Sequence, residues 1–354
     1  MRALAWKPKD GAVEIIDIPQ PRIEHEGQVL VRLIEGGLCG TDREIVRARR
    51  GKLPKGSDYM ILGHETLAEV VEAGKDATRL RPGDRVAIAP RRPCMRCAQC
   101  WRGRPDLCET GLYSERGIIG LHGMFAEYVV ENAEYVFALP PELHKIGVLM
   151  EPASVLAKTL TRAALARRTL FGADRTRRVL VLGAGPIGIL AALFAALEDS
   201  EVHTMSLESD ESRPAELLRS AGVAYSQPAS SDIRGFDCLI DCTGHPTAVF
   251  EHLDRLAHNA VVVLLGAVPH GTRHEVDVGA FLTNSVIKNL VFLGVVNADE
   301  AAWRRAARDL VKVQERHPGL LDSLLTHRFG WQQAPAAFFE RQQNEIKAVV
   351  DFAR

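Results

Sequence analysis

Residues 178–198 read RVLVLGAGPIGILAALFAALE, and this stretch decides the fold of the second half of the chain. A short apolar run leads into a G-x-G-x-x-G pattern, and a longer apolar run follows it. In a strand–loop–helix setting the first glycine allows a tight turn, the second lets a pyrophosphate approach the backbone, and the third lets helix and strand pack closely. The helix N-terminus supplies free N–H donors for the phosphates. The predicted cofactor-binding residues are Gly183, Gly185, Pro186, Ile187 and Gly188.

The choice of nucleotide depends on Glu208, which comes twenty residues after Gly188 at the end of the predicted strand VHTMSLE. A carboxylate at this place can bind both ribose hydroxyls of NAD and repels the 2′-phosphate of NADP. In the run LESDES no arginine directly follows it, and the nearest is Arg213. The alternative interpretation is a solvated charge at a strand end. We expect NAD to be favoured over NADP.

Working outward from this loop, strands and helices alternate through residues 156–319. The strand-like runs EVHTMSLE, CLIDCTG, AVVVLLGA and LVFLGVV are interspersed with the helix-like runs RPAELLRSAG and HPTAVFEHLDRLA. The run AAWRRAARDLVKVQER predicts a further amphipathic helix. This alternation indicates a parallel sheet covered by helices.

The first half of the chain has a different pattern. Short β segments with Gly and Pro punctuation, such as GQVLVRLIEGG, TLAEVVEAG, DRVAIAP and FAEYVVEN, fill residues 1–155, and GLYSERGIIGLHG is expected to be a loop. Residues 155–170, VLAKTLTRAALARRTL, have helical spacing and predict a bridge between two domains. The tail, about 320–354, is expected to return to the first domain. The chain is therefore predicted to be an α/β protein with domains 1–155 plus about 320–354, and 156–319.

Composition narrows the class of protein. The chain has 354 residues, of which 46% are hydrophobic and 25% charged, and its net charge of -1 predicts no nucleic-acid partner. Apolar stretches such as ILAALFAAL fall short of the ~20 residues that cross a membrane. The N-terminal run MRALAWKPKD does not look like a signal segment. We expect a cytoplasmic protein without a membrane partner.

Four of the seven cysteines lie in the run PCMRCAQCWRGRPDLCE at spacings C-x2-C-x2-C-x7-C. Four thiolates this close in sequence can complete a tetrahedral shell around one Zn2+, which is typical of a structural site. The pattern argues against a disulfide framework and for a reducing compartment. Cys238 and Cys242 are expected to be buried as small hydrophobic residues. The predicted structural zinc ligands are Cys94, Cys97, Cys100 and Cys108.

Three residues outside this lobe could hold a second, reactive zinc. Cys39 stands in GLCGTD, His64 in GHE, and Glu151 in LMEPAS just before the predicted bridging helix. A catalytic zinc needs three protein ligands and one open position, and these residues would supply S, N and O. Their spacing does not prove that they meet. A buried thiol, a satisfied histidine and a surface carboxylate remain the alternatives.

The order CGTD, GHE, four-cysteine lobe and GAGPIG resembles the zinc-dependent medium-chain dehydrogenase/reductase superfamily over essentially the whole chain. Further runs resemble one branch, the glucose 1-dehydrogenases that oxidise aldoses at C1: CGTDREI, RGKLPKGSDYMILGHE, APRRPC, GLYSERGIIGLHG, EPAS and GVVN. The resemblance implies a β-rich GroES-like catalytic domain, with a zinc lobe at residues 91–110, and a Rossmann doubly wound parallel sheet that binds NAD(P).

The resemblance also implies roles for particular residues. Cys39, His64 and Glu151 would bind the catalytic zinc, so that the chain would hold two zinc ions. Glu65 would be a neighbouring carboxylate that can enter the zinc shell, and Thr41 would pass a proton outward. The substrate-binding residues would be Glu115, Glu151 and Asn297, of which Asn297 would also contact the nicotinamide.

The sequence departs from the branch at three places. Pro90 stands where members can carry a polar residue, and Val155 where some carry an acid that binds the sugar. Members that favour NADP carry arginines where this chain reads LESDES. These departures concern the particular sugar that is bound rather than the type of reaction.

Two other functions stay open from the sequence. One is a zinc-dependent polyol, cyclitol or secondary-alcohol dehydrogenase of the same superfamily. The other is a zinc-free or non-catalytic relative, which the complete set of cysteines and the GHE motif disfavour. The apolar runs AVVVLLGA and LVFLGVV would permit the pairing of subunits into a homodimer or homotetramer, as in relatives.

Overall fold

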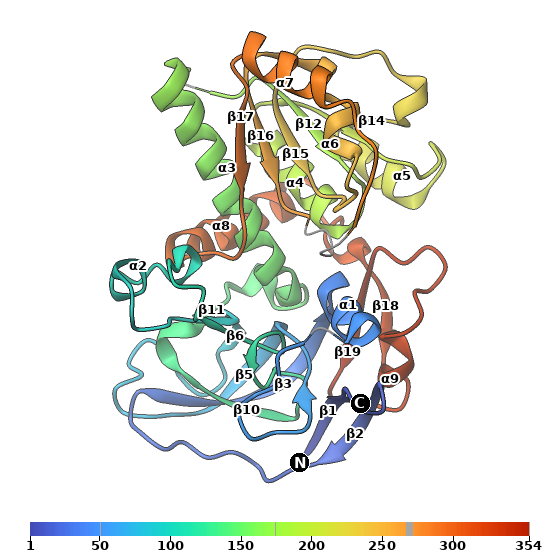
Figure 1. The fold of residues 1–354 in the computed structure, drawn as a ribbon. Coiled ribbons are helices and arrows are strands. Elements are labelled where there is room, and N and C mark those ends of the chain that lie inside the picture. The colour runs from blue at the N-terminus through green and yellow to red at the C-terminus, as the bar shows by residue number, and fades with distance from the viewer. Residues whose placement is uncertain (50, 174, 267–271, 354) are drawn as a thin grey trace. The chain divides into compact units, whose positions relative to one another are not determined.

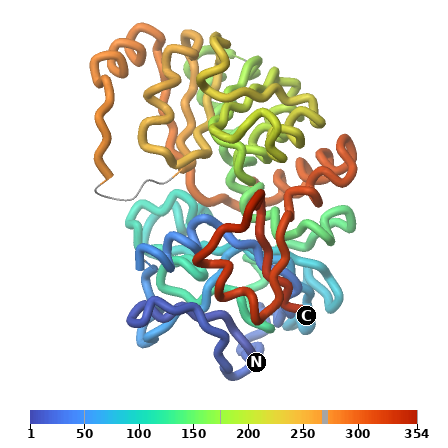
Figure 2. Tube along the Cα trace, turned by 90° about the vertical axis from the view of Figure 1, so that its right-hand side faces the viewer, coloured from blue at the N-terminus to red at the C-terminus, as the bar shows by residue number. Residues whose placement is uncertain are grey.

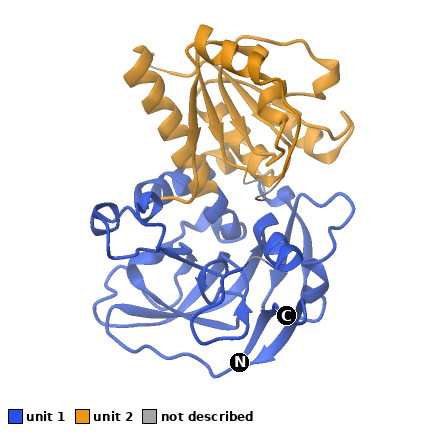
Figure 3. Ribbon diagram, in the orientation of Figure 1, with its two compact units in different colours: residues 1–152, 299–311, 321–354 blue, residues 153–298, 312–320 orange. Residues whose placement is uncertain are grey.

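The computed structural model describes residues 1–49, 51–173, 175–266 and 272–353. The chain divides into two compact units (Figure 3). Unit 1 comprises residues 1–152, 299–311 and 321–354, and unit 2 comprises residues 153–298 and 312–320.

The main sheet of unit 1 has the strand order β11-β6-β5-β3-β19-β18, with β10 also paired to β3 (Figure 1). Strand β19 pairs antiparallel with β3, so that a late segment of the chain completes a sheet begun by an early one. Figure 2 shows this late segment, in red, within unit 1. The strands are β3 (Gln28–Leu38), β5 (Glu65–Ala73), β6 (Arg85–Ile88), β10 (Tyr128–Asn132), β11 (Val136–Ala138), β18 (Leu325–Phe329) and β19 (Lys347–Asp351).

Two smaller sheets in the described part of unit 1 have the orders β2-β1-β4 and β7-β8-β9. Their strands are β1 (Arg2–Lys7), β2 (Ala12–Asp17), β4 (Met60–Ile61), β7 (Arg91–Arg92), β8 (Ser114–Arg116) and β9 (Gly120–Leu121). The glycine-rich run expected as a loop therefore contains β8 and β9. The helices of this unit include α1 (Gly40–Ala48), α2 (Ala98–Trp101) and α9 (Ala334–Ala337).

Aromatic side chains from distant segments form much of the core of unit 1. Trp6, Phe125, Trp331 and Phe338 are fully buried in one cluster. Phe125 packs against Phe352 with ring centroids 5.5 Å apart, and Trp331 meets Phe352 edge-on at 4.9 Å. Aromatic pairs at these distances stabilise the fold beyond the burial of their apolar area. The C-terminal segment is therefore held by side-chain packing as well as by strand pairing.

The sheet of unit 2 has the order β14-β13-β12-β15-β16-β17, and each neighbouring pair is parallel. Counted along the unit this is 3-2-1-4-5-6, the strand order of the Rossmann fold. The predicted parallel sheet is confirmed. Its strands are β12 (Arg178–Leu182), β13 (Glu201–Met205), β14 (Ala224–Ser226), β15 (Phe236–Asp241), β16 (Leu256–Leu264) and β17 (Val291–Gly294); its helices are α4 (Pro186–Leu197), α5 (Arg213–Ser220), α6 (Ala248–Glu251) and α7 (Val278–Ile287).

Several of the described helices differ from the sequence prediction, which did not include α1, α2 or α9. Helix α3 (Met150–Phe171) begins earlier than expected, so Glu151 lies in its first turn and not before it. Helix α6 is one short turn followed by a 3-10 turn, and Lys288 Nζ donates hydrogen bonds to the carbonyls of Leu253, Asp254 and Leu256 there. Helix α7 is apolar without a buried face, which explains why no amphipathic pattern predicted it.

Helix α8 (Glu300–Arg316) contains residues of both compact units, since 299–311 are in unit 1 and 312–320 in unit 2, whereas the predicted nucleotide-binding domain was 156–319. Residues 299–311 belong to unit 1, not to the nucleotide-binding unit. Trp303 is buried and stacks on Phe137 with ring centroids 4.8 Å apart, and Asp299 ion-pairs with Arg104 at 3.0 Å. These contacts come from side chains far away in sequence, so helical periodicity alone could not assign the segment.

Candidate metal centres and nucleotide site

Cys39, His64 and Glu65 form a compact group of metal-ligand side chains in unit 1. One ligand atom from each lies within 4.8 Å of the other two. Cys39 follows β3 and is the N-cap of α1, while His64 and Glu65 lie at the start of β5. His64 and Glu65 are buried, and Gly63 before them has φ +90, with a Cβ position only 2.0 Å from the ring of Phe125. A glycine is therefore required for His64 to reach this place.

Asp42 contacts both the backbone of Cys39 and the imidazole of His64. Its Oδ2 accepts a hydrogen bond from the backbone N–H of Cys39 at 2.9 Å, and its Oδ1 lies 3.2 Å from His64 Nδ1. Burial lowers the pKa of His64, but Asp42 and Cys39 raise it, and the pKa ends well above its usual value. A carboxylate on one ring nitrogen orients a histidine so that the other nitrogen can bind a metal.

Glu65 has a cationic partner, the buried Lys347 of β19. The Lys347 ammonium ion-pairs with Glu65 and donates a hydrogen bond to the carbonyl of Leu38 at 3.1 Å. Burial lowers the pKa of Lys347, but Glu65 and Cys39 outweigh it and the pKa is raised. Gly37 leaves room for the carboxylate, because a Cβ there would lie 2.1 Å from Glu65 Oε2.

Glu151, the third predicted ligand, does not belong to the group within 4.8 Å. Burial raises its pKa to about 7, His64 and Lys347 oppose that rise, and Glu65 and Glu115 add to it. These interactions place the Glu151 carboxyl near the group. Because Glu65 is already paired with Lys347, Glu151 remains our candidate for the oxygen ligand.

The other residues predicted for the catalytic unit are placed as follows. Glu115 lies in β8, is buried, and accepts a hydrogen bond from Arg91 Nε at 2.9 Å. Thr41 lies in the first turn of α1 and is exposed. The thiol, imidazole and carboxyl donors gathered here fit Zn2+, which binds S, N and O ligands.

The four cysteines of the lobe also meet. Their sulfurs lie within 4.8 Å of one another, and Cys94 Sγ is 3.7 Å from Cys97 Sγ. Backbone N–H groups of the lobe point at these sulfurs, as at Cys100 N to Cys97 Sγ (3.5 Å) and Arg96 N to Cys94 Sγ (3.3 Å). Hydrogen bonds from the backbone lower the pKa of Cys97. Such N–H donors stabilise thiolates, and a closed set of four fits a structural zinc.

The glycine loop of unit 2 has the geometry that dinucleotide binding needs. Gly183 follows β12 with φ +95. A Cβ on Gly188 would lie 1.9 Å from the carbonyl oxygen of Gly183, so only glycine allows this helix–strand approach. A Cβ on Gly185 would meet no atom within 4 Å, which leaves its backbone open to a ligand. Pro186 and Ile187 begin α4, whose N-terminus is thus available to a pyrophosphate.

Glu208 does not end a strand, as the sequence suggested, because β13 stops at Met205. The first residue after the strand is Ser206, whose hydroxyl accepts a hydrogen bond from Ala184 N at 3.1 Å and donates one to the Glu208 carboxylate. Glu208 itself is exposed. Ser206 therefore links the glycine loop to the acidic side chain.

Asn297, which follows β17, is itself buried and has φ +55. Its Oδ1 accepts a hydrogen bond from Ala298 N at 2.9 Å, and the preceding carbonyl, of Val296, accepts one from Lys158 Nζ at 2.9 Å. The segment is thus held from both sides within unit 2.

Sequence reasoning missed four residues that shape these sites: Asp42, Ser206, Lys347 and Arg91. Asp42 had a local signal, since it stands three residues after Cys39 in a capping position. Ser206 directly follows an apolar strand, where a small polar residue could have been noticed. Lys347 and Arg91 act on partners in distant segments and had no such signal.

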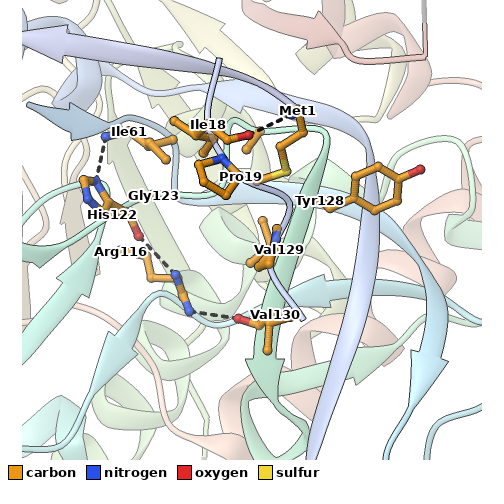
Figure 4. A pocket seen from close by; sticks show the side chains of 12 residues that line it. Met1, Ile18, Pro19, Ile61, Arg116, His122, Gly123, Tyr128, Val129 and Val130 are labelled. Carbon is orange, nitrogen blue, oxygen red and sulfur yellow. Dashed lines mark hydrogen bonds between the residues drawn. The ribbon is translucent and has the colours of Figure 1, made fainter. Parts of the chain in front are cut away.

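A pocket of about 200 Å3 opens elsewhere in unit 1 (Figure 4). Met1, Ile18 and Pro19 line it on one side, and Ile61, His122 and Arg116 on another. None of the predicted site residues lines this pocket, so it offers no support for a second site.

The metal-ligand clusters and the Rossmann loop can now be compared with known proteins. Residues 25–141 match the alcohol dehydrogenase GroES-like domain, and residues 144–352 match the glucose dehydrogenase C-terminus. A glucose 1-dehydrogenase of Methanocella arvoryzae is 36% identical over 99% of both chains. Another of Caldivirga maquilingensis is 39% identical over 96% of this chain and 95% of its own.

The chain belongs to the glucose dehydrogenase family of zinc-dependent medium-chain dehydrogenases. A structure of this family, Haloferax mediterranei glucose dehydrogenase in complex with NADP, Zn and gluconolactone, is 28% identical and has a TM-score of 0.89 over 100% of both chains. The resemblance in the motifs and the predicted pairing of a GroES-like with a Rossmann domain are confirmed. As a member, the protein is an NAD(P)-dependent oxidoreductase of CH–OH groups. No helix in the described ranges is long and apolar enough to cross a membrane.

Proposed function

We propose that this protein oxidises glucose, or an aldose like it, at C1 to the lactone and passes the hydride to a nicotinamide nucleotide. The observation that carries the proposal is the group of Cys39, His64 and Glu65, with Glu151 beside it, in a chain of this family. The relatives named above are glucose 1-dehydrogenases over their full length, and one structure contains gluconolactone.

In this proposal Cys39, His64 and Glu151 hold the catalytic zinc. The metal supplies Lewis-acid polarisation of a hydroxyl oxygen. Asp42 keeps the imidazole of His64 oriented, and Lys347 supplies the countercharge to Glu65. Thr41, exposed at the start of α1, passes the hydroxyl proton outward.

Recognition of the sugar falls to Glu115, Glu151 and Asn297. A carboxylate accepts hydrogen bonds from sugar hydroxyls, and a hydroxyl left without a partner in a buried site costs about 1–3 kcal/mol. The nicotinamide accepts the hydride, and the protein contributes position and electrostatics. Cys94, Cys97, Cys100 and Cys108 hold a second, structural zinc, so we propose two zinc ions per chain.

The test is an activity screen of aldoses and polyols with NAD and NADP, followed at the absorbance of the reduced nicotinamide, with zinc measured on the same sample. We expect glucose-like aldoses to be oxidised to a lactone and two zinc ions per chain. His64→Asn should lose one zinc and the activity, whereas His25→Asn, at an exposed histidine, should keep both. Oxidation of polyols without any aldose would refute the proposal.

We also propose that NAD is preferred to NADP. The carboxylate of Glu208, tied to the glycine loop through Ser206, fits ribose hydroxyls and opposes a 2′-phosphate. The nearby arginines are engaged with carboxylates: Arg213 with Glu216 at 2.6 Å, and Arg219 with Asp210 at 2.8 Å.

The measurement is kcat/KM for NAD and NADP. Glu208→Ala should reduce the ratio of kcat/KM for NAD to kcat/KM for NADP. Glu211→Ala, at another exposed acid of the same loop, should leave this ratio unchanged. A clear NADP preference in the native protein, the nucleotide seen in the Haloferax structure, would show the proposal to be wrong.

We propose a homodimer or homotetramer that associates through unit 2. Helix α7 exposes Leu282 (55%), Val286 (74%) and Ile287 (63%), and β17 is an edge strand of the sheet. Exposed apolar side chains beside an open strand edge favour association. Leu282→Lys should lower the mass measured by light scattering, and a native monomer would contradict the proposal.

We propose the cytoplasm as the location. Each of the seven cysteines is a free thiol, and reduced thiols persist in reducing compartments. Cell fractionation with an antibody would test it, and recovery from the cell exterior would refute it.

A further inference from the structure

Arg91 and Glu115 form a buried ion pair in the small sheet of unit 1. They stand opposite each other in the antiparallel register of β7 and β8, and Arg91 Nε donates to Glu115 Oε1 at 2.9 Å. Their side chains are 3% and 9% exposed. Because two short strands fix both backbones, the direction of the Glu115 carboxylate depends on this arginine.

The guanidinium of Arg91 is fixed on its other side by Tyr113. Its central carbon lies 3.8 Å from the centre of the tyrosine ring. A planar guanidinium that stacks on a ring while donating to a carboxylate has little freedom to rotate. Among the described residues, however, nothing accepts a hydrogen bond from its buried Nη2.

The neighbouring arginine, Arg92, forms a similar ion pair in which the terminal nitrogens all have acceptors. Arg92 stacks on Tyr135 at 3.9 Å, pairs with the buried Glu131, and donates through Nη1 to the carbonyls of Ala89 (2.7 Å) and Arg91 (2.8 Å). Its terminal nitrogens are thus satisfied. Arg91 keeps one buried donor that needs an oxygen acceptor, and burying such a donor without one is unfavourable. Arg91 is therefore less fully bonded than Arg92, whose terminal nitrogens all have acceptors.

The strand that carries Glu115 also leads to the candidate catalytic group. A Cβ on Gly117, two residues after Glu115, would lie 2.7 Å from the carbonyl oxygen of Gly63, the residue before His64. A carboxylate held in one direction beside this group can accept hydrogen bonds from sugar hydroxyls, since each hydroxyl has a proton to donate.

We propose that Arg91 is a positioning residue for sugar recognition, which fixes the carboxylate of Glu115 in the direction in which it accepts hydrogen bonds from the sugar hydroxyls. This inference rests on the proposed function. The inference predicts that the effects of substituting Arg91 and Glu115 are not additive. A residue that acts through Glu115 loses its effect once Glu115 is removed.

The experiment is a double-mutant cycle of Arg91→Met and Glu115→Gln on the zinc-loaded native chain, measured with glucose. Arg91→Met alone should raise KM for glucose about tenfold or more, with a smaller change in kcat. In the Glu115→Gln background the same substitution should change kcat/KM by less than about twofold. The KM for the nucleotide and the zinc content should stay at native values. Arg91→Lys keeps the positive charge but not the planar guanidinium, so its KM for glucose should lie between those of the native protein and Arg91→Met. It replaces Arg91→Met in the experiment if that variant does not fold.

The matched control is the cycle of Arg92→Met and Glu131→Gln, whose residues have the same kind of pair and stack. These variants should lower thermal stability and leave the KM for glucose near the native value. An Arg91→Met loss of equal size in both backgrounds, or an unchanged KM for glucose, would overturn the inference. If the native protein oxidises glucose and the Arg91→Met variant has the native KM for glucose, this inference fails and the proposed function stands. If the native protein oxidises no aldose, both the inference and the proposed function fail.

Discussion

Replacing Glu131 with glutamine should destabilise unit 1 strongly at neutral pH. The Glu131 carboxylate of β10 is 4% exposed and ion-pairs with both Arg92 and Arg116, the latter at 2.5 Å. It also accepts a hydrogen bond from Asn132 N at 2.8 Å. Glutamine keeps the shape but leaves two arginines, 12% and 18% exposed, without their shared countercharge.

Removing one partner of a buried ion pair typically costs about 3–5 kcal/mol. Both arginines keep backbone acceptors, as Arg116 does at the carbonyls of His122 (3.1 Å) and Val130 (3.2 Å). The loss should therefore fall near the lower end, about 3 kcal/mol in the free energy of unfolding.

The loss should depend on pH. Burial raises the pKa of Glu131, but Arg116 and Arg92 outweigh it and hold the pKa below its usual value. A carboxyl whose pKa is depressed on folding stabilises fully above its unfolded pKa, about 4.3, and loses that contribution as pH falls through the lower folded value. The difference in free energy of unfolding between the native protein and Glu131→Gln should therefore become smaller below about pH 4.

Tryptophan fluorescence in urea measures this unit selectively, because the four tryptophans, Trp6, Trp101, Trp303 and Trp331, all belong to unit 1. Glu142→Gln, at an exposed acid of the same unit, is the control and should behave as the native protein. The prediction is wrong if Glu131→Gln lowers the free energy of unfolding by less than about 1 kcal/mol. It is also wrong if the difference in free energy of unfolding between the native protein and the variant stays the same at low pH.

Three further changes have expected outcomes. Gly188→Ala should abolish NADH binding in a fluorescence titration, because the new Cβ would lie 1.9 Å from the Gly183 carbonyl oxygen; binding at native affinity would contradict this. Asp42→Asn should weaken zinc binding by about 10- to 100-fold in chelator competition, since it removes the charge that orients His64, and an unchanged affinity would speak against that role. Cys100→Ser should remove one zinc per chain by native mass spectrometry and lower the melting temperature while the second zinc remains; retention of both ions would rule out the lobe as a zinc site.

The parts of this protein that the sequence predicts well are those coded by neighbouring residues. The Rossmann loop is one strand, three glycines and one helix in succession, and the lobe cysteines lie within fifteen residues. Local chemistry was therefore enough to predict both. The family followed from several such runs in a fixed order.

Pairs brought together by the tertiary structure could not be predicted. Lys347 reaches Glu65 through the pairing of β19 with β3, and Arg91 reaches Glu115 through that of β7 with β8. Trp303 assigns the start of α8 to unit 1 by stacking on Phe137. Lys288 donates hydrogen bonds to the carbonyls of Leu253 and Leu256, more than thirty residues earlier in the chain. The catalytic-zinc ligands, the role of Glu115 and the nucleotide preference stay predictions.

The position of β19 has a consequence for how the protein is made. The Lys347 ammonium binds the carbonyl of Leu38, 309 residues earlier in the chain. During translation, residues 153–298 leave the ribosome whole and can fold first, while the sheet of unit 1 still lacks its partner strand. Until then the carboxylate of Glu65 lacks the lysine with which it is paired in the finished protein. Loading of the metal is thus expected to be a post-translational step, completed only after residue 347 has emerged.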